Sequence, residues 1–219
     1  MKQLLIFDLD GTLLNSIADL GHAANFALEQ CGFPTHPIEA YPQFVGSGVT
    51  KLLERVLPES SRNPEQVEVM RGYFKQYYGE HMTDETKPYP GIVDLLHNLT
   101  EHGIHVAVAS NKYQSAVEHL ILTCFPDIPW AAIEGHKEGV NVKPDPSIVF
   151  EILGKCPTAK SEVLYVGDSG IDMETARRAC VESVGVTWGF RPVAELRACN
   201  ADHIVETTGQ ILRLALGED

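Results

Sequence analysis

The sequence predicts an α/β protein built on a parallel sheet with an inserted helical segment, and three observations lead to this prediction. The run Leu4-Leu5-Ile6-Phe7 has no polar alternation, as expected for a central strand covered on both faces. Further apolar runs at residues 104–109 and 163–166 also end in polar motifs. About ninety residues separate the first two runs, far more than one crossover helix requires, so a further unit is inserted there.

Four helical segments are expected in the insertion, at residues 16–31, 37–44, 49–57 and 63–81. Ser16 is the expected N-cap of the first segment and Gly32 its stop, whereas Asn63-Pro64 begins the last. We therefore predict an α-helical cap domain at residues 15–82 and a core domain at residues 1–14 and 83–219. The core resumes with an amphipathic helix at residues 92–99, which precedes the second strand.

Directly behind the first strand stands Asp8-Leu9-Asp10-Gly11-Thr12. Ligands of open α/β sheets bind at the carboxyl ends of such strands. Two carboxylates that share one face repel each other unless a cation lies between them, which indicates a divalent metal. Gly11 permits a tight turn, and Thr12 offers a hydroxyl to an oxyanion. The alternative is an ordinary Asp-Gly turn after a strand.

Three later motifs also follow apolar runs or turns. Ser110-Asn111 supplies a hydroxyl, an amide and backbone N–H groups at a strand end, which suits either a phosphate or a helix N-cap. Asp168 directly ends the third strand, and Asp172 falls in the first turn of the next helix, where it could simply favour the helix dipole. Lys143 precedes a proline, and taken alone it would be a solvated loop lysine.

The four motifs appear in the order DxDGT, SN, KP and GDxxxD, and this ordered set resembles the haloacid dehalogenase superfamily of phosphohydrolases. The resemblance extends over nearly the whole chain. It implies a Rossmann-like, doubly wound parallel sheet in which the strands that carry the first, second and fourth motifs are neighbours. It also implies a small helical cap that closes over the phosphate site.

The resemblance assigns a role to each motif residue. Asp8 is expected to be the nucleophile that forms an aspartyl-phosphate, Asp10 the general acid and base, and Lys143 the neutralising cation. Thr12, Ser110 and Asn111 are expected to bind the phosphate. The expected cofactor is Mg²⁺, with the metal-site residues Asp8, Asp10 through its carbonyl, Asp168 and, in support, Asp172.

The cap contains a glycine-flanked loop, Gly46-Ser47-Gly48, followed by Lys51 and Arg55. An ordinary interhelical turn with solvated bases is the alternative to a substrate-binding loop. The run from Tyr41 to Arg55 most resembles the phosphoglycolate phosphatases of the superfamily. This resemblance implies substrate selection by Ser47, Lys51 and Arg55, with Lys51 the first candidate.

Composition is typical of a cytoplasmic enzyme. No apolar run approaches the roughly 18 residues of a membrane span, and Asp8 interrupts the N-terminal run too early for a signal peptide. The five cysteines form no C-x-x-C pair, so we expect reduced thiols. A net charge of -13 argues against nucleic acid or an anionic membrane as partner. The expected partner is a small phosphorylated metabolite, and the sequence leaves the oligomeric state open.

These features together predict a Mg²⁺-dependent phosphatase of small metabolites, with 2-phosphoglycolate the leading candidate. Within the enzyme class, the alternatives are a pyrophosphatase, a sugar or nucleotide phosphatase, and a phosphomutase of the β-phosphoglucomutase type. A receiver-type phospho-switch is the alternative from another class. Such a switch requires neither the second acidic motif, at Asp168 and Asp172, nor a cap.

Overall fold

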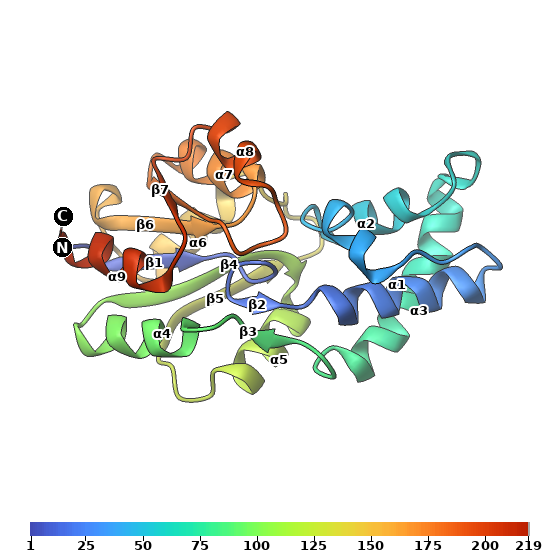
Figure 1. Ribbon diagram of the computed structural model, residues 1–219, viewed down its shortest axis with the longest axis horizontal. Coiled ribbons are helices and arrows are strands. Elements are labelled where there is room, and N and C mark those ends of the chain that lie inside the picture. Colours follow the sequence, from blue (N-terminus) through green and yellow to red (C-terminus); the bar gives the residue numbers. More distant parts are fainter. Residues whose placement is uncertain (219) are drawn as a thin grey trace.

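The computed structural model describes residues 1–218, and a six-stranded parallel sheet forms its centre (Figure 1). The order of the strands is β5-β4-β1-β6-β7-β8. Their bounds are Leu4–Phe7 (β1), His105–Tyr113 (β4), Trp130–His136 (β5), Val163–Gly167 (β6), Glu182–Val186 (β7) and His203–Val205 (β8). Because β1 lies between β4 and β6, the strands that carry three of the motifs are neighbours, which confirms the expected arrangement.

Helices cover both faces of this sheet. Leu5 and Phe7 belong to a hydrophobic cluster with residues of α4, α5 and α9, whereas Leu4 and Ile6 belong to a second cluster with residues of α6 and α7. Alternate side chains of a strand point to opposite faces, so the unbroken apolar run of β1 fills both clusters. The core helices are Ile92–Glu101 (α4), Gln114–Cys124 (α5), Ser147–Lys155 (α6), Gly170–Ala179 (α7), Val193–Ala198 (α8) and Thr208–Leu216 (α9), with a 3₁₀ turn at Lys160–Glu162. The doubly wound α/β fold is thus confirmed.

A separate group of helices lies beyond the carboxyl ends of the strands, on the right in Figure 1. It consists of Ile17–Gln30 (α1), Gly48–Val56 (α2) and Pro64–His81 (α3), with 3₁₀ turns at Ile38–Gln43 and Glu59–Ser61. Helices α1 and α3 pack against each other, and the rings of Phe26 and Tyr77 stack with centroids 4.9 Å apart. We refer to this group as the cap.

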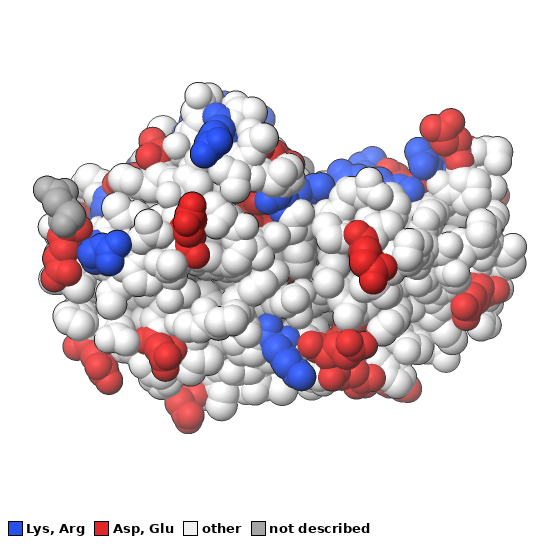
Figure 2. Space-filling model, viewed as in Figure 1, with Lys and Arg blue, Asp and Glu red and all other residues white. Residues whose placement is uncertain are grey.

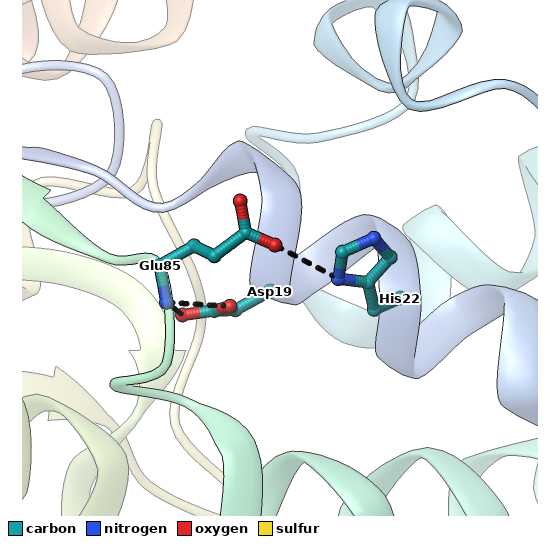
Figure 3. A group of neighbouring side chains, drawn as sticks. All are labelled: Asp19, His22 and Glu85. Atoms are coloured by element: carbon teal, nitrogen blue, oxygen red, sulfur yellow. Dashed lines mark hydrogen bonds and ion pairs between the residues drawn. The ribbon is translucent and has the colours of Figure 1, made fainter.

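Two linkers join the cap to the core, and they lie side by side. Leu14–Asn15 (β2) pairs antiparallel with Lys87–Pro88 (β3). Just beyond this pair, the buried carboxylate of Asp19 accepts hydrogen bonds from the backbone N–H group of Glu85 (Figure 3). It also accepts from the N–H group and the hydroxyl of Thr86. The start of the cap is therefore tied to its end by a short strand pair and one carboxylate.

Two details differ from the simplest sequence-based expectation. Ser16 is the N-cap residue of α1, but its hydroxyl donates to Oδ1 of Asp10 at 2.5 Å and does not cap the helix. Strand β4 continues through Ser110 and Asn111 to Tyr113, so these residues lie on the strand itself and not in a turn. Within residues 1–218, no helix is long and apolar enough to cross a membrane.

Candidate active site

The end of β1 places two carboxylates beneath the cap. Asp8 continues the ladder with a hydrogen bond from its N–H to the carbonyl of Val166, and the chain then turns at Gly11, whose φ is +91°. A Cβ atom at position 11 would lie 2.5 Å from Oδ2 of Asp168. Only glycine accommodates both this backbone conformation and this close approach.

Lys143 connects two of the motifs. Its Nζ atom donates to Asp8 Oδ1 at 2.8 Å, to Asp172 Oδ1 at 2.7 Å and to the carbonyl of Ala109 at 2.9 Å. Burial alone would lower the pKa of Lys143, but the charges of Asp172 and Asp8 outweigh it and hold this pKa well above its ordinary value. The lysine is therefore a fixed cation against Asp8.

Asp172 has partners for both of its oxygens. Oδ1 accepts from Lys143, while Oδ2 accepts from the N–H and hydroxyl of Ser169 in a capping box at the start of α7. A Cβ atom at Gly167 would lie 2.3 Å from Cβ of Asp172, so this packing requires glycine. The helix-cap role and the site role of Asp172 therefore occur together.

Asp168 directly follows β6 and is the third member of the acidic group, with Asp8 and Asp172. It is buried, and its Oδ2 accepts a hydrogen bond of 2.7 Å from the N–H of Phe190. Burial, followed by the charges of Asp172 and Asp8, raises the pKa of Asp168 well above its ordinary value. Burial and Asp172 likewise raise the pKa of Asp8 to about 7, against the opposing effect of Lys143. The neighbouring carboxylates repel one another in a region that excludes water.

This group fits a divalent cation. Ligand atoms of Asp8, Asp168 and Asp172 all lie within 4.8 Å of one another. All of these donors are carboxylate oxygens, which Mg²⁺ prefers over the nitrogen and sulfur ligands of zinc sites. A cation here would stabilise the ionised forms of Asp8 and Asp168 that burial disfavours. Both oxygens of Asp172 already have partners, on Lys143 and on Ser169.

The predicted phosphate-binding residues lie at the same strand ends. The Thr12 hydroxyl is buried and has no hydrogen-bond partner among the described residues. Ser110 and Asn111 line the cavity that contains Asp8. The Asn111 side chain also binds the backbone of Lys143, donating to its carbonyl at 3.2 Å and accepting from its N–H at 2.8 Å. Asn111 thereby positions the loop that carries the lysine.

Asp10 has a partner that sequence reasoning missed. Its Oδ2 lies 3.0 Å from Nζ of Lys112, a buried residue that follows Ser110 and Asn111 on β4. The Lys112 Nζ atom also lies 4.8 Å from the ring centroid of Tyr78 on α3. The signal was present, since Lys112 directly follows the second motif, but a lysine after a strand is usually solvated.

The cap encloses the site with a largely apolar surface. The cavity is lined from the core by Asp8, Asp10, Ser110, Asn111, Lys112 and Tyr113, and from the cap by Leu20, Val45, Gly46, Gly48, Val49, Leu52, Phe74 and Tyr78. None of Ser47, Lys51 and Arg55 lines this cavity. Ser47 and Lys51 line a wider opening next to it, together with Arg71 and Lys75.

The two basic cap residues that were predicted to select the substrate, Lys51 and Arg55, have partners within the cap. Lys51 has a side chain that is 58% exposed, and it pairs with Glu54 at 2.6 Å. Arg55 donates to the carbonyl of Phe44 and to the hydroxyl of Ser47. From the core, Arg191 donates to the carbonyl of Val45, a cap residue that lines the cavity, at 3.0 Å. Arg55 from the cap and Arg191 from the core thus both bind the loop of residues 44–47.

Comparisons with known proteins agree with this geometry. Residues 5–186 match the family of haloacid dehalogenase-like hydrolases. The chain belongs to this family. Phosphoglycolate phosphatase of Haemophilus influenzae (strain 86-028NP) is 29% identical, with 97% of each chain covered. Phosphoglycolate phosphatase of Aquifex aeolicus is 33% identical, with 86% of each covered.

Solved structures of this hydrolase family extend the comparison. A crystal structure from Lactobacillus delbrueckii subsp. bulgaricus, provisionally assigned as a phosphoglycolate phosphatase, is 34% identical to this haloacid dehalogenase-like hydrolase. It covers 100% of both chains with a TM-score of 0.94. The likeness therefore includes the cap as well as the sheet.

Proposed function

We propose that this hydrolase is a Mg²⁺-dependent phosphatase that acts through an aspartyl-phosphate, with 2-phosphoglycolate as its substrate. The coarser part, a phosphoric monoester hydrolase, follows from the family and from the relatives named phosphoglycolate phosphatase. The observation that supports the finer part is Lys143, which joins Asp172 to Asp8, and Asp8 lines the cavity together with Asp10.

In the first half-reaction, an oxygen of Asp8 attacks phosphorus and the bond from phosphorus to the ester oxygen breaks. Asp10 gives its proton to the departing oxygen, which leaves as an alcohol. In the second half-reaction, Asp10 takes a proton from water, and the resulting hydroxide displaces Asp8 from phosphorus. The sum is hydrolysis of the ester to an alcohol and phosphate, with both aspartates restored.

The remaining residues bind charge and hold the reacting groups. Lys143 neutralises the negative charge shared by Asp8 and the phosphoryl oxygens, and Thr12, Ser110 and the Asn111 backbone donate hydrogen bonds to those oxygens. Mg²⁺, held by Asp8, the Asp10 carbonyl and Asp168 with support from Asp172, would supply further positive charge next to the phosphoryl group. The Thr12 hydroxyl, buried without a partner, supports this assignment because a bound phosphate would satisfy it.

Inorganic phosphate release from a panel of phosphorylated metabolites tests the proposal. We expect 2-phosphoglycolate to have the highest kcat/KM with Mg²⁺ present. The Asp8→Asn variant should fold normally and release no phosphate in the steady state, because an amide does not attack phosphorus. Turnover by the pure Asp8→Asn protein would refute the covalent mechanism, whereas a better sugar, nucleotide or pyrophosphate substrate would change only the substrate assignment.

A further inference from the structure

The cavity above Asp8 has one basic side chain among its lining residues, and this side chain comes from the core. The lining from the cap is apolar apart from Tyr78, with Leu20, Leu52 and Phe74 among its members. Such walls cannot compensate the charge of a second anionic group on a substrate. Lys112 is therefore the cation available to an anion inside this cavity.

Lys112 has hydrogen-bonding capacity to spare. Its side chain is 5% exposed, and its Nζ atom pairs with Asp10 Oδ2 at 3.0 Å. An ammonium group has three donors, and a single pairing leaves donors that can be directed toward the cavity. An ion pair with a carboxylate favours the charged form of a lysine, so the pairing with Asp10 keeps Lys112 positively charged.

Tyr78 supplies a second, independent observation. It is 1% exposed, lines the same cavity from α3, and its hydroxyl has no hydrogen-bond partner among the described residues. Its ring lies against the Lys112 ammonium, with Nζ 4.8 Å from the centroid. A buried hydroxyl without a partner is costly, and a ligand that enters the cavity would supply one.

We propose that Lys112 and Tyr78 form the subsite for a carboxylate on the leaving part of the substrate. This inference rests on the proposed function and assigns its selectivity to residues of β4 and α3. Lys112 and the leaving oxygen share Asp10 as their partner, so an anion bound by Lys112 lies close to the ester oxygen. The subsite therefore fits a phosphorylated hydroxy acid of two or three carbons.

The same geometry argues that substrate selectivity does not come from the cap loop, Gly46-Ser47-Gly48, or from Lys51 beyond it. Lys51 is more than half exposed, pairs with Glu54 and lines the outer opening. Ion pairs at such exposed positions contribute little because water and salt screen them. Lys112 lies within the cavity itself, where a carboxylate would lose its water and would gain most from a cation.

Two substrates of matched size test the subsite: 2-phosphoglycolate, and 2-hydroxyethyl phosphate, which replaces the carboxylate by a neutral hydroxymethyl group. The variants are Lys112→Met, which retains the aliphatic stem, and Tyr78→Phe, which removes only the hydroxyl. For Lys112→Met we expect kcat/KM for 2-phosphoglycolate to fall at least about tenfold more than for the neutral substrate. For Tyr78→Phe we expect a smaller shift of the same sign.

The comparison of two substrates separates selectivity from damage to Asp10. Loss of the Lys112 charge beside Asp10 affects proton transfer to both leaving groups, so only the ratio of the two kcat/KM values reports the carboxylate. Equal losses on both substrates would overturn the subsite. A ratio that changes in Lys51→Met and not in Lys112→Met would also overturn it and would return selectivity to the cap loop.

The wild-type ratio distinguishes this inference from the proposed substrate. If the wild-type enzyme prefers 2-phosphoglycolate and Lys112→Met has the same ratio of kcat/KM values as wild type, the proposed substrate is retained and the subsite is refuted. If the wild-type enzyme shows no preference, the proposed substrate itself is wrong and the subsite falls with it. Should Lys112→Met fail to fold, as judged by circular dichroism, the ratio in Tyr78→Phe decides, and an unchanged ratio there refutes the subsite.

Discussion

Asp10 differs from Asp8 in its partners, and this difference suits their different tasks. Asp8 is fixed by Lys143, whereas Asp10 accepts from the Ser16 hydroxyl and pairs with Lys112, which hold its carboxylate toward the cavity. A nucleophile needs its oxygen close to phosphorus. A general acid needs its oxygen near the leaving group, where both partners of Asp10 can orient it.

The Asp10→Asn variant tests this division of labour. An amide cannot transfer the proton, so we expect kcat for an alkyl phosphate to fall about 10² to 10⁴-fold. The loss should be smaller for p-nitrophenyl phosphate, because its leaving group needs little protonation. Steady-state kinetics on both esters measure the effect. Parent-like rates on the alkyl ester would exclude Asp10 as the acid.

The motif residues could be predicted from the sequence, but their neighbours could not. Asp8 and Asp168 directly follow strands, Ser110 lies near the end of β4, and Lys143 precedes a proline. Parallel strands bring such positions to one edge of the sheet. Tyr78 carries no comparable signal. It lies on a helix of the cap, and only the tertiary fold brings it to Lys112, 34 residues away in sequence.

The linkers between core and cap depend on one side chain of α1. The Asp19 carboxylate, at the start of the cap, binds the returning linker through the backbone N–H groups of Glu85 and Thr86. The Glu85 side chain is largely exposed and pairs with His22 at 3.5 Å (Figure 3). In Asp19→Asn, one acceptor oxygen becomes a donor that faces other donors. We expect a loss of about 1–3 kcal/mol in the free energy of unfolding and faster proteolysis at residues 83–87.

Glu85→Gln is the matched control for this variant. It alters the exposed contact with His22 and leaves the backbone N–H of residue 85 in place, so we expect a change within about 0.5 kcal/mol. Urea unfolding and limited proteolysis of both variants measure the difference. Equal stability of the two variants would contradict the role of Asp19.

Strand β5 carries the buried carboxylate of Glu134, which pairs with Lys137 and Lys155. Burial alone would raise the pKa of Glu134, but hydrogen bonds from Lys137 and Lys155 outweigh it and hold this pKa below its ordinary value. A lowered pKa contributes stability above the unfolded-state pKa of about 4.5, and this contribution is lost as the pH falls through the folded-state value.

We therefore expect Glu134→Gln to destabilise the protein by about 1 kcal/mol at pH 7, since both lysine partners are roughly half exposed and water screens them. The difference between wild type and variant should shrink as the pH is lowered below 4. Urea unfolding at a series of pH values measures it. A difference that grows toward low pH would show that the ion pairs are not its source.

Among the elements, long periodic segments were easier to predict than short ones. Helix α3 begins after Asn63 and ends at His81 as expected, because Asn63 accepts from the N–H of Gln66 and Pro64 suits the first turn. The pairing of β2 with β3 has no sequence signature. Two-residue strands carry no alternation to detect, and their pairing depends on where the cap returns to the core.

At the scale of the whole molecule, the metal should couple activity to stability. Exhaustive chelation by EDTA should abolish phosphate release, and Mg²⁺ should restore it. Mg²⁺ should also raise the melting temperature, because it relieves repulsion among Asp8, Asp168 and Asp172 and binds only the folded state. Full activity after chelation and dialysis would exclude a metal, and calorimetry gives a readout independent of turnover.

The overall charge of the molecule and the charge of the opening beside the cavity have opposite signs. The net charge is -13, yet Lys51, Arg71 and Lys75 line the opening beside the cavity. On the face shown in Figure 2, basic side chains gather at the hollow between the two lobes, and acidic side chains are spread over the remainder. An anion repelled at long range therefore meets a favourable field at this opening.

Because the strand pair β2–β3 and the Asp19 hydrogen bonds hold both linkers together, the cap has a single line about which it can rotate. Rotation about one line moves nearby atoms little and distant atoms far. The contacts between cap and core that lie away from this line include the loop at residues 44–48, where Arg191 and Asn111 reach the carbonyls of Val45 and Gly46, and the contact of Lys112 with Tyr78. Substrate and product that pass this loop would both travel beside Lys51, Arg71 and Lys75.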